Sequence, residues 1–223
     1  MKITVTKDGP YAVSGGPSLS KQTIATDAAG ESDRWLPGET IAVGASYALC
    51  RCGQSSRKPF CDGTHAQVGF DGQETASRQL YSEQAQEIDG PVLALTDAES
   101  LCAFARFCDR DGTVWNTVSE ARSGFAREAF THQVGQCPSG RLVAWDVSAR
   151  KPVEPVLAPS IVLIEDPHEG VSGPLWVRGG IEVVGADGIA YETRNRVTLC
   201  RCGESRNKPF CDGTHASVGF TDK

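Results

Sequence analysis

Two segments of the chain carry the same set of potential metal ligands at the same spacing. Leu49–Phe70 and Leu199–Phe220 align without a gap and differ at four of 22 positions. Three cysteines and one histidine recur in each segment: Cys50, Cys52, Cys61 and His65, then Cys200, Cys202, Cys211 and His215. Three thiolates and an imidazole can fill the four protein positions of a zinc site or an iron–sulfur cluster. The sequence therefore predicts two soft-metal centres.

The spacing within each set suits a compact centre. Cys-x-Cys places two thiolates on one short extended piece, while Cys61 and His65 are four residues apart and share one face of a helical turn. Asp62 stands where a helix N-cap is expected, and Gly63 lets the backbone pass close to a metal. Ligand type alone leaves zinc and an iron–sulfur cluster both open.

A longer signature resembles a known family. The pattern C-x-C-x2-S-x3-P-x-C-D-G-T-H is complete in both copies. It resembles the CDGSH-type, or mitoNEET-like, iron–sulfur family, with Thr in place of the usual Ser or Ala. The resemblance implies a [2Fe–2S] cluster in each copy, held by three cysteines and one histidine. It also implies an intertwined two-fold dimer, which a chain with both copies is expected to form internally, as a monomeric pseudo-dimer.

The histidine and the basic neighbours bear on the chemistry of these centres. Imidazole in place of thiolate removes a negative charge, which should raise the reduction potential and leave the cluster easier to release. Basic residues flank both sites: Arg51, Arg57 and Lys58, then Arg201, Arg206 and Lys208. They form either a solvated rim or a set that stabilises the reduced cluster or docks an acidic partner.

A third group of cysteines lies between the copies. Cys102, Cys108 and Cys137, in the pattern C-x5-C…C-P, resemble divergent mono-cluster ferredoxin domains. The resemblance implies a [3Fe–4S] cluster, or a [4Fe–4S] cluster with a fourth ligand that the pattern does not identify. The intervening residues lack glycine, and a helix from Thr96 or Asp97 toward Phe107 would point Cys102 and Cys108 about 120° apart. Simple packing of buried cysteines is the alternative.

The repeat extends beyond the ligands. Gly9–Gly16 resembles Gly173–Gly180, and the longer spacing in the first copy assigns the polar segment Ser18–Glu39 to a surface loop. Further expected elements are strands over 47–49, 141–145 and 196–199, a hairpin over 181–193 and a helix over 120–134. We expect an α+β fold: a first β-rich module over 1–85, an inserted α/β segment over 86–152 and a second β-rich module over 153–223.

Composition and charge limit the cellular compartments and the kinds of partner that are expected. The chain has 223 residues, nine cysteines and a net charge of −6, so general binding to nucleic acid or anionic membranes is not expected. It shows no signal peptide and no apolar run long enough to span a membrane. Free thiolates are available as ligands in a reducing compartment, so we expect a cytoplasmic protein.

These observations predict a soluble carrier of two [2Fe–2S] clusters. Electron transfer is one expected role, and cluster transfer or redox sensing is the other. The expected partner is a redox protein or an apo iron–sulfur acceptor. A structural zinc module for protein interaction is the alternative. Because no nucleophile–base constellation is evident, we do not expect an enzyme.

Overall fold

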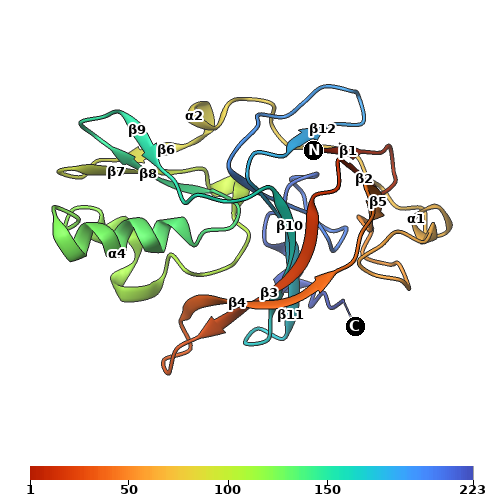
Figure 1. The fold of residues 1–223 in the computed structure, drawn as a ribbon, viewed down its shortest axis with the longest axis horizontal. Coiled ribbons are helices and arrows are strands. Elements are labelled where there is room, and N and C mark those ends of the chain that lie inside the picture. The colour runs from red at the N-terminus through yellow and green to blue at the C-terminus, as the bar shows by residue number, and fades with distance from the viewer. Residues whose placement is uncertain (223) are drawn as a thin grey trace.

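The two copies build two β-sheets; in Figure 1 the first lies at the upper right and the second runs through the centre and bottom. The computed structural model describes residues 1–222. The first sheet has the strand order β12-β1-β2-β5 and the second β13-β11-β10-β3-β4. The first consists of β1 (Lys2–Val5), β2 (Tyr11–Ser14), β5 (Ser46–Leu49) and β12 (Glu182–Val184). The second consists of β3 (Ser18–Thr26), β4 (Ser32–Ile41), β10 (Ser160–Asp166), β11 (Val171–Arg178) and β13 (Arg196–Leu199).

Each sheet includes strands from the other copy: the first sheet takes one, β12, and the second takes two, β3 and β4. Strand β12 of the second copy pairs in parallel with β1, and β3 of the first copy pairs in parallel with β10. The remaining strands, β1-β2-β5 and β10-β11-β13, match in order and are antiparallel throughout. The copies are thus related by a pseudo-two-fold arrangement, and the predicted intertwined α+β fold is confirmed.

The copies also share one apolar core. Residues that face this core alternate along the strands, although β10 and β11 are buried on their other face as well. Equivalent positions of the two copies, Ile3 and Val13 in one and Ile161 and Val177 in the other, are at most 2% exposed and belong to a single cluster. Neither copy therefore has a separate apolar interior.

The segment between the copies forms a third, antiparallel sheet with the order β6-β7-β8-β9. Its strands are β6 (Gln86–Ile88), β7 (Leu93–Asp97), β8 (Leu142–Asp146) and β9 (Lys151–Val153). Helix α4 (Gly124–Gly135) lies along this sheet on the left of Figure 1 and packs Phe130 and Val134 against Leu93 and Leu95. Shorter helical pieces are α2 (Tyr81–Gln84), α3 (Val114–Thr117), η1 (Glu99–Leu101) and η2 (Arg110–Gly112). No helix among residues 1–222 combines the length and apolar character that a membrane crossing demands.

Arg196 joins the middle segment to the second copy. Its guanidinium is 1% exposed and donates to the carbonyls of Val134, Gly135 and Cys137 at the end of α4, and to that of Leu142. A cation at a helix C-terminus satisfies carbonyls that have no partner within the helix. The second copy is thereby attached directly to the middle segment.

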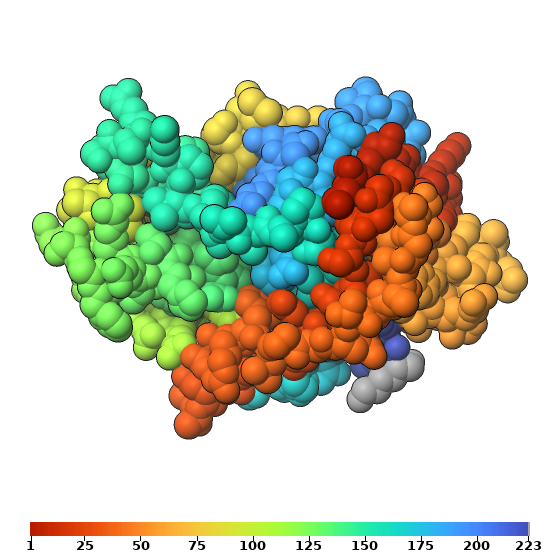
Figure 2. All heavy atoms as spheres, viewed as in Figure 1, coloured from red at the N-terminus to blue at the C-terminus, as the bar shows by residue number. Residues whose placement is uncertain are grey.

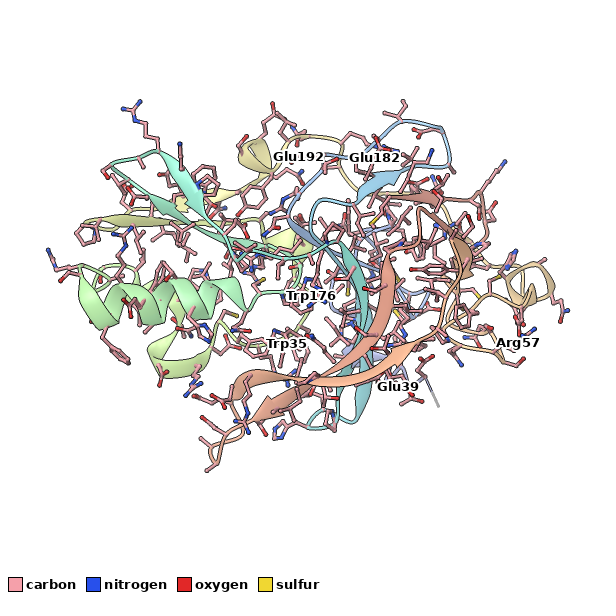
Figure 3. All side chains as sticks on the ribbon, in the orientation of Figure 1. Trp35, Glu39, Arg57, Trp176, Glu182 and Glu192 are labelled. Atoms are coloured by element: carbon pink, nitrogen blue, oxygen red, sulfur yellow. The ribbon has the colours of Figure 1, made fainter. Side chains whose placement is uncertain are left out.

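An aromatic cluster makes a second junction. Trp35 of β4 stacks at 5.0 Å from Trp176 of β11 and at 4.9 Å from Phe107 of the middle segment. Figure 3 shows Trp35 and Trp176 close together, beside the middle segment. These rings form an apolar cluster separate from the shared core.

Several sequence-based expectations need correction. The predicted loop Ser18–Glu39 is wrong, because most of it lies in the β3–β4 hairpin, whose pairing with β10 supplies the order that its polar sequence does not show. The predicted helix from Thr96 toward Phe107 is also wrong. Asp97 lies in β7, and its carboxylate accepts from the Arg141 guanidinium and the Trp115 indole instead of capping a helix. The expected hairpin over 181–193 is short: Ala190 bridges to Val184 of β12, and the Tyr191 amide donates to the Val183 carbonyl at 2.9 Å, but no second named strand forms.

The other expected elements are confirmed. The helix over 120–134 is α4, and the strands over 47–49, 141–145 and 196–199 correspond to β5, β8 and β13.

The two Cys-x-Cys-Gly loops meet back to back, which offers a test of the intertwined arrangement. A methyl group added at Gly53 would overlap the Cys202 carbonyl oxygen, and one added at Gly203 would lie 2.6 Å from that of Cys52. We expect Gly53→Ala to destabilise the fold by left-handed strain of about 1–2 kcal/mol plus overpacking of about 1–3 kcal/mol. Urea unfolding measures the loss.

Gly188→Ala is the matched control. Gly188 also has a left-handed φ, 82° against 72° at Gly53, but nothing lies within 4 Å of an added methyl group. This variant should show the strain alone. Equal losses in the two variants would contradict the close loop contact.

Candidate metal centres

The backbone brings the four ligands of each copy together in the same way. Strand β5 ends at Leu49, which bridges to Phe60. The Cys50 amide donates to the Pro59 carbonyl at 2.8 Å, and the Cys61 amide donates to that of Ala48 at 3.0 Å. The second copy repeats both bonds, from Cys200 to Pro209 and from Cys211 to Thr198. A short strand followed by a returning loop thus holds the third cysteine beside the Cys-x-Cys pair.

The ligands are grouped in pairs. Sulfur–sulfur separations are 3.7 Å for Cys50–Cys52 and 3.8 Å for Cys200–Cys202. The cysteine sulfur and histidine Nδ1 lie 3.4 Å apart in Cys61–His65 and 3.5 Å apart in Cys211–His215. Two ligands on one tetrahedral metal, with bonds of about 2.3 and 2.0 Å, lie about 3.5–3.8 Å apart. Each pair therefore has the separation of two ligands on one metal atom.

The grouping does not extend to larger sets. Among the described residues, no three Cys, His, Asp or Glu side chains are arranged to hold a single metal ion.

A single helical turn carries each histidine. Helices α1 (Thr64–Gln67) and α5 (Thr214–Ser217) have Gly63 and Gly213 as N-cap residues, with left-handed φ values of 92° and 86°. The N-cap was expected at Asp62, but the structure places it one residue later, at Gly63. The Asp62 carboxylate accepts from the Thr64 amide at 3.0 Å and the Ser56 amide at 2.8 Å, and bonds to Thr64 hold its pKa well below the usual range. Asp62 thus ties the loop before Cys61 to the turn that carries His65.

Several cysteine sulfurs lie so close together and so deeply buried that a bound cation is needed for all of them to be thiolates. Burial raises the pKa of Cys211, and the neighbouring Cys200 sulfur, followed by burial, raises that of Cys202. Backbone amides point at the sulfurs of Cys52 and Cys202, both at 3.5 Å. A bound cation favours the thiolate form outright. The donor set therefore fits an iron or zinc centre.

The two histidines differ in exposure. His215 is 4% exposed, whereas His65 and Cys61 are half-buried. Burial lowers the pKa of His215 to about 4 and so favours the neutral imidazole that binds metals.

The basic residues divide into two groups. Arg57 and Arg206 are exposed, and Figure 3 shows Arg57 extending from the outer edge of the first copy. Arg51 and Arg201 are not part of a solvated rim, because they are only 1% and 3% exposed. Arg51 donates to the carbonyls of Gly9, Gly72 and Thr6. Arg201 pairs with the carboxylates of Glu165 and Asp222, and burial lowers its pKa. Both arginines fix the loops that carry the ligands.

Tyr11 is a supporting residue that the motif did not indicate. It lies in the first copy, is fully buried, and donates its hydroxyl to the Cys200 and Pro209 carbonyls of the second copy at 2.9 and 3.1 Å. No short sequence pattern could identify Tyr11 as a supporting residue, because its partner Cys200 is 189 residues away in sequence.

Cys102, Cys108 and Cys137 line one small cavity of about 30 Å³ together with Arg141. The two arguments against a shared site do not hold. Residues 102–108 form a loop and not a helix, and Phe104 and Arg106 take left-handed φ values of 54° and 61° in place of glycine.

The surroundings of these cysteines fit a charged group. In the described chain, no backbone amide from 103 to 108 donates a hydrogen bond. Burial, then Asp109 and the other two cysteines, raises the pKa of Cys108. Three half-buried cysteines beside unpartnered amides match the needs of an iron–sulfur cluster. His132 is bonded to Gln136 at 2.9 Å and is not among the residues that line the cavity.

The paired cysteine and histidine ligands on intertwined β-modules are those of a metal-binding protein. Comparison with protein families identifies the class of metal-binding protein. The family described as iron-binding zinc finger CDGSH type matches residues 8–66 and 172–216. The family described as divergent 4Fe-4S mono-cluster matches residues 88–147. The chain carries two CDGSH-type segments with a divergent 4Fe-4S mono-cluster segment between them, and is an iron–sulfur protein. Comparisons with curated proteins and with solved structures gave no match.

The Arg201 ion pair gives a test of the loop supports. Glu165→Ala leaves a buried guanidinium with one carboxylate fewer, so we expect a loss of about 1–3 kcal/mol in the free energy of unfolding. Glu39→Ala is the control, because Glu39 pairs with Lys21 while 63% of its side chain is exposed. Its loss should stay below about 1 kcal/mol. Similar urea midpoints for the two variants would show that Arg201 does not depend on Glu165.

Proposed function

We propose that the protein carries a [2Fe–2S] cluster in each CDGSH-type segment and acts as a carrier of electrons or of clusters, not as an enzyme. Cys50, Cys52, Cys61 and His65 would hold the first cluster, and Cys200, Cys202, Cys211 and His215 the second. The pairing of ligands carries the proposal, because two pairs at tetrahedral separations suit two iron atoms per site. A cluster of this kind supplies a one-electron redox couple.

The chain's own residues support electron transfer in two ways. Buried Arg51 and Arg201 follow Cys50 and Cys200 directly, and a positive charge beside the ligands offsets the charge of an added electron. The shared core and the back-to-back contact of the two Cys-x-Cys-Gly loops hold the ligands in fixed positions. A redox protein is the proposed partner, and exposed Arg57 and Arg206 favour an acidic surface on it.

One observation favours the second role, cluster transfer or redox sensing. Cys61 and His65 are half-buried, so an acceptor thiolate can approach the first site. An apo iron–sulfur protein is the proposed acceptor. All nine cysteines are free, which supports a reducing, cytoplasmic setting.

The middle cavity is proposed to hold a third cluster, of the [3Fe–4S] or [4Fe–4S] type, on Cys102, Cys108 and Cys137. Their common cavity and the unpartnered amides around it support this assignment.

Metal analysis of anaerobically purified protein tests the cofactors. Two [2Fe–2S] clusters give about four iron atoms per chain, and a third cluster raises the count to about seven or eight. A Cys102→Ser, Cys108→Ser, Cys137→Ser variant should lose only the additional iron and keep the visible spectrum of the [2Fe–2S] centres. Zinc without acid-labile sulfide would support the structural zinc alternative and overturn the proposal.

The two carrier roles are separated by a transfer assay. Incubation with an apo-ferredoxin should move clusters if transfer is the role, because the first site is open to an acceptor thiolate. Rapid reduction by a cellular flavoprotein reductase, with the clusters retained, would indicate electron transfer. A protein that neither transfers its clusters nor undergoes reduction would contradict both roles.

A further inference from the structure

The two CDGSH-type segments have nearly identical sequences but different surroundings. Their ligand sets and spacings are the same, and 18 of 22 aligned residues are identical. Any difference in exposure between the sites must therefore come from the chain packed around them. Cys61 and His65 are half-buried, whereas Cys211 and His215 are 3% and 4% exposed.

The equivalent glycines Gly63 and Gly213 show what covers the second site. Nothing lies within 4 Å of a methyl group built on Gly63. A methyl group built on Gly213 would lie 3.4 Å from both the Cys102 carbonyl and the Phe104 side chain. The loop 102–106 of the middle segment therefore lies against the turn that carries His215.

Charged and aromatic contacts hold this loop in place. Arg106 pairs with buried Asp166 at 2.7 Å and lies over the Phe104 ring at 5.2 Å. Asp166 belongs to β10 of the second copy. The loop is thus fixed to the same copy whose site it covers.

In the second copy, the loop that precedes Cys211 is covered as well. The amides of Thr75 and Ala76 donate to the Lys208 carbonyl at 2.8 and 2.9 Å. Asn207 donates to the Ser100 carbonyl at 2.9 Å, and the first copy has exposed Arg57 at the equivalent position. One of the four sequence differences between the copies therefore coincides with a contact to the middle segment.

The first site projects from the molecule. In Figure 2 the part of the chain that contains α1 forms a separate lobe at the right edge, away from the middle segment. Residues 66–69 that follow His65 are all exposed.

We propose that the two repeated centres have different roles: the second is sealed by the middle segment and retained, and the first is the centre that exchanges its cluster. This inference rests on the proposed function, in which both sites hold clusters. Loss of a cluster requires ligands to open to a competing group, and local opening is rarer where more contacts must break.

Chelator challenge of the full-length protein, loaded with its clusters, tests the proposal. With EDTA as the probe, the visible circular dichroism of the [2Fe–2S] centres, followed apart from the signal of a third cluster, should decay in two phases. Their rates should differ by at least about tenfold, which corresponds to about 1.4 kcal/mol. His65→Cys and His215→Cys are matched variants that each give one site a fourth thiolate ligand, soft and negatively charged, in place of the imidazole. We expect slower loss of the cluster from the altered site. His65→Cys should slow the fast phase alone, and His215→Cys should leave that phase unchanged.

A second pair of variants tests the cover itself. Phe104→Ala removes the side chain beside Gly213 and should speed the slow phase at least severalfold. Phe125→Ala is the control, because this residue is 85% exposed on α4, and it should change neither phase. A slow phase that is unaffected by Phe104→Ala would overturn the role given to the loop.

The remaining outcomes are also decisive. A single decay phase, or a fast phase that is altered by His215→Cys, would overturn the inequality of the centres. If the protein contains zinc and no sulfide, the proposed function fails separately. Zinc release into a chromogenic dye then decides by the same criterion whether the sites are unequal.

Discussion

The back-to-back contact of the two Cys-x-Cys-Gly loops is the constraint on which the other features depend. Gly53 lies against the Cys202 carbonyl and Gly203 against that of Cys52, with no room for a side chain at either place. Such an approach requires each copy to be held from the other side, and the exchanged strands β3 and β12 provide this. Tyr11 adds two hydrogen bonds across the same junction. The geometry of one ligand set is therefore fixed by residues of both copies.

The ligand spacing could predict the local site but not its surroundings. Cys61 and His65 are four residues apart, so a single turn is enough to bring them together, and the motif contained that information. The β3–β4 hairpin could not be found in the same way, because its polar strand β3 is ordered by pairing with β10, which lies over 130 residues away in sequence, and β4 then pairs with β3. The burial of Arg51 has a similar cause. Its partners Thr6, Gly9 and Gly72 surround it only after the fold forms.

In the middle segment, the local sequence predicted a helix that would separate Cys102 from Cys108, and the structure shows why that prediction failed. Thr96 and Asp97 resemble a helix start, but the Asp97 carboxylate is taken by Arg141 and Trp115 within the third sheet. The chain then turns at Phe104 and Arg106 in conformations that non-glycine residues rarely adopt. Contacts of both residues with the second copy, through Gly213 and Asp166, hold these conformations. The cavity of the three cysteines and the cover of His215 are therefore two sides of one loop.

Charge adds a second difference between the repeated centres. Within the described chain, buried Arg51 contacts carbonyls and no carboxylate, whereas Arg201 is paired with Glu165 and Asp222. Arg51 is therefore the less compensated of the two charges. In the proposed function an added electron makes a cluster more negative, so the less compensated Arg51 would favour the reduced state of a cluster at the first site. Exposure and charge would thus act in the same direction, and both support the proposal that the first centre is the one that meets a partner.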